Sequence, residues 1–99
     1  MRIKSFEIGG HKVAIKYLKA IQDSDGRNLF GVCNPKTNTI NIATIMDGEK
    51  IAEDVVIHSI YHEIAHMFMI MMYEHKLNAN EKFIDNLGMH LHQFSKTVK

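Results

Sequence analysis

The stretch from Glu49 to Glu74 contains neither proline nor glycine, the two residues that most often interrupt a helix. When its residues are placed at 100° intervals, one broad face is apolar and so is most of the opposite face. The first face carries Ile57, Ile60, Ile64, Met67, Phe68 and Met71, and the second carries Ile51, Val55, Met69 and Tyr73. A helix that is apolar nearly all round is buried on both sides. We therefore expect a central helix over residues 49–75, packed between two other layers.

The flanking segments indicate what those layers are. Before the helix, segments with strand-like patterns at 2–8, 11–18, 29–33 and 39–45 are separated by turn residues such as Gly9-Gly10. After it, residues 78–98 carry one apolar stripe, with Asn78 as a plausible N-cap. The prediction is a single α+β domain spanning 1–99. It consists of a small antiparallel sheet of about four strands, forming a β-meander at 1–46, then the central helix and a covering C-terminal helix at 78–98.

Composition narrows the class of protein. A formal net charge of +1 with no basic stripe argues against a nucleic-acid partner. The longest apolar run, residues 67–73, is too short to span a bilayer, so we expect no membrane association. A single cysteine, Cys33, fits a reducing compartment, and the N-terminus lacks the apolar run of a signal peptide. These features predict a cytoplasmic protein.

One motif within the predicted central helix carries chemistry, the sequence His62-Glu63-Ile64-Ala65-His66. Histidines four residues apart lie on one helix face, about 6 Å apart along the axis, and can converge on one zinc ion. Glu63 points about 100° away, so it does not reach the ion but lies beside it. Zinc lowers the pKa of water, and such a carboxylate takes the proton as the water attacks a carbonyl. Because the neighbouring positions are apolar, both imidazoles would be buried and need partners, which favours a metal over two incidental histidines.

The other histidines carry weaker signals. His58 extends the i, i+4 series, but it lies about 12 Å from His66 along the axis, too far for both to bind one ion easily. We expect His58 to be a partly exposed helix residue or a neighbour of the ligands. His11, His75 and His90 are expected at the surface.

A third ligand has to come from elsewhere in the chain, and the C-terminal helix offers candidates. Glu81, Asp85 and His92 lie on a stripe at one edge of its apolar face. We favour Glu81 over Asp85, with His92 third; a capping box from Asn78 to Glu81 is the competing interpretation, and a solvated helix face is the one for the other two. Gly88 costs about 1 kcal/mol relative to alanine inside a helix, which suggests that two helices approach closely there.

HEIAH followed by Glu81-Lys82-Phe83-Ile84-Asp85 resembles the glutamate-zincin metallopeptidases, whose pattern is HExxH and then ExxxD. The resemblance implies that Glu81 is the third zinc ligand and that Asp85 orients a zinc histidine. Over nearly its full length the chain is also similar to small phage- and prophage-encoded proteins of this type, through its N-terminal hairpins, a strand centred on Gly31 and the HExxH helix. This implies a minimal zincin-like fold and, for a phage-encoded chain, the host cytoplasm.

Two functions follow as hypotheses. The first is a zinc-dependent metallopeptidase-like hydrolase with Glu63 as general base, acting on an extended peptide or protein that pairs with residues 39–45 as an exposed edge strand. The alternative is a catalytically inactive, zinc-stabilised module that binds a phage or host partner protein. An open fourth position on the ion with Glu63 beside it would favour the hydrolase, whereas four protein ligands would indicate a structural site. A metal-free core of packed histidines ranks last, and no oligomeric state is implied.

Overall fold

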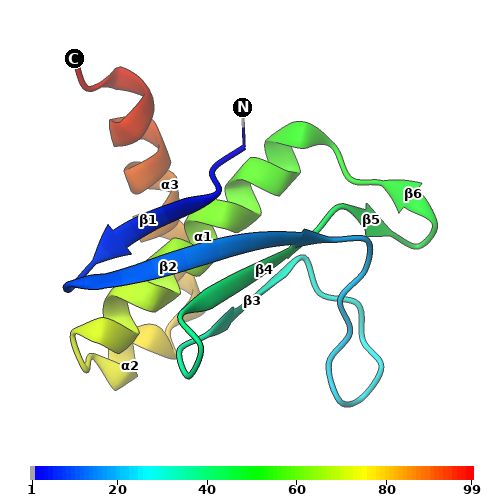
Figure 1. Ribbon diagram of the computed structural model, residues 1–99, viewed down its shortest axis with the longest axis horizontal. Helices are drawn as coiled ribbons and strands as arrows, with labels where there is room; N and C mark the ends of the chain where they lie inside the picture. Colours follow the sequence, from blue (N-terminus) through cyan, green and yellow to red (C-terminus); the bar gives the residue numbers. More distant parts are fainter. Residues whose placement is uncertain (1) are drawn as a thin grey trace.

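A four-stranded sheet lies against one long helix in the computed structural model, which describes residues 2–99 (Figure 1). The strands are β1 (Ser5–Ile8), β2 (His11–Leu18), β3 (Gly31–Asn34) and β4 (Thr39–Ala43), in the spatial order β1-β2-β4-β3. The predicted α+β class with a four-stranded sheet is confirmed.

The predicted antiparallel meander is wrong in one pairing. β1 pairs with β2 and β3 with β4 in antiparallel fashion, but β2 and β4 run parallel, with Ile15 opposite Ile40. The segment between β2 and β3 is long enough to cross over, so β4 enters beside β2. Burial explains this order, because β4 is the most apolar strand and takes an interior position, while β3 occupies an edge. The sheet is therefore mixed.

The helices follow the predicted plan with shifted ends. α1 (Glu53–Met71) begins four residues later than predicted, because β5 (Ile45–Met46) and β6 (Glu49–Lys50) pair as a small hairpin. A short helix that the sequence did not indicate, α2 (His75–Asn78), precedes α3 (Glu81–Thr97). The predicted N-cap is also wrong. Asn80 caps α3 by accepting a hydrogen bond from the Phe83 backbone N–H at 3.0 Å, because Asn78 belongs to α2.

α1 is buried on both sides, but the predicted second face is partly wrong, because Val55 and Tyr73 are exposed and Ile51 precedes the helix. Towards the sheet, Val56, Ile60, Ile64 and Met67 of α1 join the apolar residues of β2 and β4 in the main core. Towards α3, Ala65 and Met69 pack with Ile84 in a second, smaller cluster. Two apolar clusters thus fix α1 between the sheet and α3. No helix among residues 2–99 is long and apolar enough to cross a membrane.

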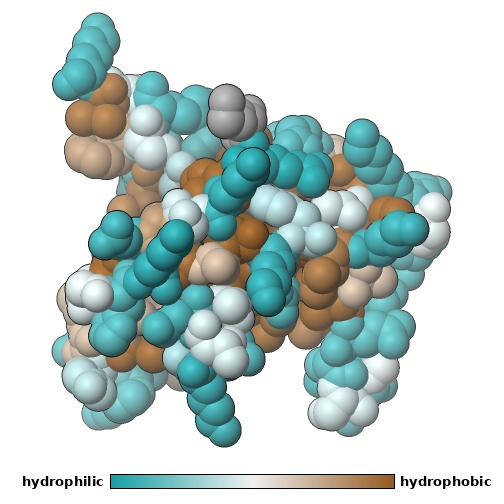
Figure 2. All heavy atoms as spheres, viewed as in Figure 1, coloured by the Kyte–Doolittle hydropathy of each residue, from teal (hydrophilic) through white to brown (hydrophobic). Residues whose placement is uncertain are grey.

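The N-terminal half of α3 is buried more deeply than its C-terminal half, which still contacts Tyr61 of α1 through His92 and Ser95. Its two buried residues are Ile84 and Gly88, whereas Phe94 and Val98 near its end are mostly exposed. The C-terminal end projects beyond the sheet (Figure 1), and apolar residues reach the surface there, at the upper left of Figure 2. The more deeply buried part of α3 is the part that carries Glu81 and Asp85.

Candidate metal centre

A close helix–helix approach brings the chemically active side chains together. A Cβ atom at Gly88 of α3 would lie 2.8 Å from the carbonyl oxygen of Tyr61 and 3.1 Å from the Cα of His62, both in the backbone of α1. Only glycine leaves room for this contact, which confirms the close approach expected at this position. The acidic side chains earlier in α3 can therefore reach the histidines of α1.

His62, His66 and Glu81 form the first group of donor atoms. His62 Nε2 lies 3.2 Å from one carboxylate oxygen of Glu81, and His66 Nε2 lies 3.4 Å from the other. The donor atoms all lie within 4.8 Å of one another. Around a tetrahedral zinc ion with bonds of about 2.1 Å, neighbouring ligand atoms are about 3.4 Å apart, so this spacing fits one ion. The three side chains are therefore a suitable donor set for a metal ion.

The second nitrogen of each histidine has its own partner. His62 Nδ1 lies 3.2 Å from an oxygen of Asp85, and His66 Nδ1 lies 2.7 Å from the side-chain oxygen of Asn78. A ring whose Nδ1 donates to this oxygen directs the lone pair of its Nε2 towards Glu81. Lone pairs and a carboxylate facing one another repel unless a cation or a proton lies between them. This tautomer is the one that a metal ligand requires.

The role of Asn78 could not be read from the sequence. Asn78 reaches His66 only because α2 turns the chain back at that point, and a four-residue helix carries no periodic signal. The sequence pattern predicts Asn78 as the cap of the following helix, a position that Asn80 occupies in the structure.

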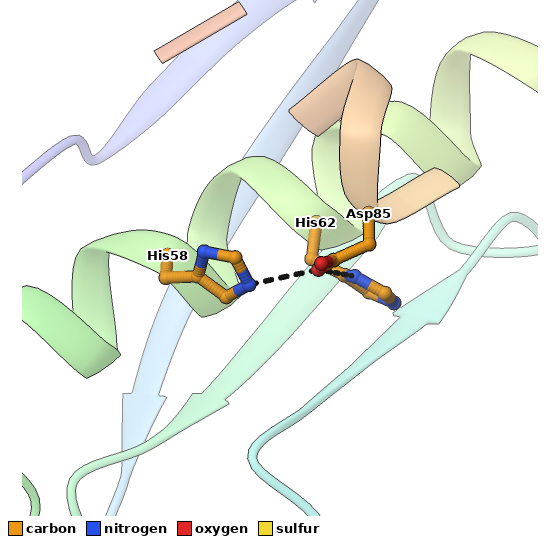
Figure 3. Close-up of side chains that lie close together, drawn as sticks. All are labelled: His58, His62 and Asp85. Atoms are coloured by element: carbon orange, nitrogen blue, oxygen red, sulfur yellow. Dashed lines mark hydrogen bonds and ion pairs between the residues drawn. The ribbon is translucent and has the colours of Figure 1, made fainter. Parts of the chain in front are cut away.

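His58, Asp85 and the Nδ1 of His62 form a second group of donor atoms. His58 Nε2 lies 2.8 Å from the same Asp85 oxygen that contacts His62, so one oxygen lies between two imidazole rings (Figure 3). Both His58 and Asp85 are half exposed. Partial burial alone would raise the pKa of Asp85, but the hydrogen bonds from His62 and His58 lower it below its ordinary value. His58 is thus partly exposed and a neighbour of a candidate ligand, as expected.

His92 lies apart from both groups. Its ring stacks on Tyr61 with the ring centroids 4.8 Å apart, and it belongs to neither cluster of donor atoms within residues 2–99. The structure therefore brings Glu81 and Asp85 to the histidines of α1 but leaves this third candidate outside.

Glu63 lies beside the first group, in the wall of a cleft. The cleft has a volume of about 410 Å³ and is lined by Phe30, Gly31, Val55, His58, Ser59, His62, Glu63 and Asp85. Glu63 is only 8% exposed, and a Cβ at Gly31 would come within 3.1 Å of its Cγ. Burial raises the pKa of Glu63 to about 7, with His66 lowering it and Glu81 raising it further. A carboxyl group here can hold or release a proton near neutral pH.

The open edge of the sheet beside this cleft is β3. The prediction that residues 39–45 form the exposed edge strand is wrong, because β4 lies between β2 and β3. The Phe30 carbonyl accepts from the Ala43 backbone N–H at 2.9 Å, and antiparallel hydrogen bonding alternates along a strand. The backbone groups of Gly31 and Cys33 therefore point away from β4, towards solvent. Sequence reasoning marked Gly31 only as part of a family-like strand.

Neither models of protein families, nor curated proteins, nor solved structures gave a match to this chain. The geometry alone shows two groups of His, Asp and Glu side chains, within the described residues, that could hold a metal ion.

Proposed function

We propose that the chain is a zinc-dependent hydrolase of the metallopeptidase type, with His62, His66 and Glu81 as metal ligands. The observation that carries this proposal is the convergence of two Nε2 atoms and one carboxylate at 3.2–3.4 Å, with each Nδ1 occupied by an oxygen acceptor. Two imidazoles and one carboxylate suit zinc, and three protein ligands leave a position open.

The catalytic step needs a base close to the ion. Zinc held by three protein ligands supplies Lewis acidity and makes water at the site more acidic. Glu63 is turned away from the donor atoms of its neighbours and stands in the wall of the cleft. There it accepts a proton from the attacking water and returns it to the leaving amine of a peptide bond. Its burial keeps bulk water from competing for that proton.

The edge of β3 supports an extended peptide as the substrate. The outward backbone groups of Gly31 and Cys33 can pair with a peptide strand. Gly31 lies directly against Glu63, so a peptide paired there would run past this carboxyl group. Phe30 and Val55, both partly exposed in the cleft, offer apolar contacts to its side chains.

The test combines metal content with turnover. The purified chain is expected to contain about one zinc per molecule, to melt at a lower temperature after chelation, and to cleave members of a broad peptide library. Glu63→Gln should retain the zinc and the fold but lose about 10²–10⁴-fold in rate, as expected for a missing base. Glu74→Gln, an exposed neighbour just beyond α1, is the matched control and should cleave normally.

Two results would contradict the proposal. A chain without a transition metal, showing no melting shift when zinc is added, has no metal site of this kind. A chain that binds zinc but cleaves no member of the library, or cleaves as well with Glu63→Gln, is instead a zinc-stabilised module. In that case the open edge of β3 would bind an extended segment of a partner protein without cutting it.

A further inference from the structure

The candidate ligands belong to a longer alternating row across two helices. His66, His62 and His58 stand on successive turns of α1, and Glu81 and Asp85 on successive turns of α3. Contacts of 2.8–3.4 Å link them in the order His66, Glu81, His62, Asp85, His58. The proposed zinc site uses only the first three members. The outer end of the row has donor atoms of its own.

We propose that His58, Asp85 and the Nδ1 of His62 form a second, outer site for a transition-metal cation such as Zn²⁺. The donor atoms are two imidazole nitrogens and one carboxylate oxygen, all within 4.8 Å of one another, the same set as in the inner site. Figure 3 shows the Asp85 oxygen between the two rings. It lies 2.8 Å from His58 Nε2 and 3.2 Å from His62 Nδ1. These separations are close to the spacing of ligands around one ion, about 3.4 Å for bonds of about 2.1 Å.

Exposure makes the outer site accessible and weaker than the inner one. His58 and Asp85 are both 49% exposed in their side chains. In the inner site the carboxylate of Glu81 is 69% exposed, but both imidazoles are more buried, His62 at 22% and His66 at 16%. Half-exposed side chains adjust easily around an ion, but they lose more freedom and more hydration when they bind it. The inner site therefore fills first.

The two sites share His62, so they oppose each other. An ion on Nε2 of His62 binds more tightly while Nδ1 donates its proton to the Asp85 oxygen, because this contact makes the ring a better ligand. An ion at the outer site would take that same oxygen and release the Nδ1 proton to solvent, so that His62 would hold one ion on each ring nitrogen. Each ion consequently weakens the binding of the other, and the coupling is reciprocal. Excess metal is then expected to loosen the inner ion.

The test is a titration of the metal-free full chain with Zn²⁺ in an isothermal titration calorimeter. The wild type should bind two ions, the second at least about tenfold more weakly than the first. About tenfold is the smallest loss of metal affinity that is typical when the partner of a metal ligand is disturbed. His58→Ala should abolish only the weak phase. His66→Ala should abolish the tight phase and leave one ion on the outer site, bound more tightly than the second ion of the wild type. His90→Ala removes an exposed α3 histidine outside both groups and is the matched control.

The outcomes separate this inference from the proposed function. Two ions bound by His58→Ala, a single ion bound by the wild type, or none bound by His66→Ala would overturn the outer site. A tight phase that survives His66→Ala and disappears in His58→Ala would overturn the inner site and leave the outer one standing. Equal affinities of the outer site in the wild type and in His66→Ala would refute the coupling. Circular dichroism checks that α1 stays helical, and alanine at the half-exposed position 58 favours a helix.

Discussion

Replacing Gly88 with alanine sets two physical effects against each other. Alanine is the better helix former, so intrinsic propensity alone would stabilise α3 by about 1 kcal/mol. The new Cβ, however, would lie 2.8 Å from the Tyr61 oxygen, 3.0 Å from the Tyr61 carbonyl carbon and 3.1 Å from the His62 Cα. All three atoms belong to the backbone of α1, so no side-chain rotation can relieve the contact.

The helices must therefore separate by several tenths of an ångström. Overpacking of this kind costs about 1–3 kcal/mol, which exceeds the gain in helix propensity over most of that range. We expect Gly88→Ala to lower the free energy of unfolding by about 1 kcal/mol on balance. Because Asp85 lies less than one turn before Gly88, its contact with His62 should also lengthen and zinc affinity should fall.

The assay is urea unfolding of the metal-free chain, followed by a zinc titration. The control is the pair Asn86→Ala and Asn86→Gly, at an exposed position of α3 two residues away. The difference between their free energies of unfolding measures how much α3 prefers alanine to glycine where no packing contact is involved. If Gly88→Ala raises the free energy of unfolding by as much as the two Asn86 variants differ, α3 does not lie this close to α1 and the predicted clash does not exist.

Three further predictions concern the candidate ligands, their partners and the thiol. Glu81→Gln should weaken zinc binding strongly, as measured by competition with a chelating dye. If Asp85→Asn lowers the zinc affinity more than Glu81→Gln does, Asp85 is the third ligand beside His62 and His66. Asp85→Asn and Asn78→Ala should each cost about 10–100-fold, the range for partners that orient a ligand, and an unchanged affinity would remove that role. Burial, with a smaller effect of Glu63, raises the pKa of Cys33 to about 12. Because a raised pKa favours the neutral thiol, maleimide labelling of the native chain should stay slow up to pH 9, and fast labelling at pH 8 would contradict it.

Local pattern was enough to predict the two long helices, α1 and α3, but not α2. The apolar residues of α1 recur with the helical period on two faces, and the HExxH spacing follows from the same period, so the geometry of His62 and His66 on one face could be derived in advance. The choice between Glu81 and Asp85 as third ligand could not be derived in advance, because both lie on the same edge of α3. Only the packing of the two helices shows that Glu81 faces both Nε2 atoms while Asp85 faces Nδ1 of His62.

Strand order needed information that alternation does not carry. The alternating pattern of β2 and the Ile-x-Ile pattern of β4 identify strands and their buried faces, but not their neighbours. The wrong edge strand in the sequence interpretation follows directly from this gap. In the structure the most apolar strand is enclosed, and the strand containing Gly31 is left at the edge, where a residue without a side chain lets the backbone pass close to Glu63.

The register of α1 against α3 explains how so small a chain can assemble a site from two helices. Donor residues repeat every four positions on both helices, a rise of about 6 Å, so the histidines and carboxylates alternate across the interface once one contact is fixed. Gly88 fixes that contact on the same turn as His62. The buried apolar part of this interface is small, with Ala65, Met69 and Ile84 at its centre. Holding α3 in register therefore depends on the donor atoms as well as on the core, and an ion between them would contribute to the folding of α3, at about 4 kcal/mol for a ligand at a thousand times its dissociation constant.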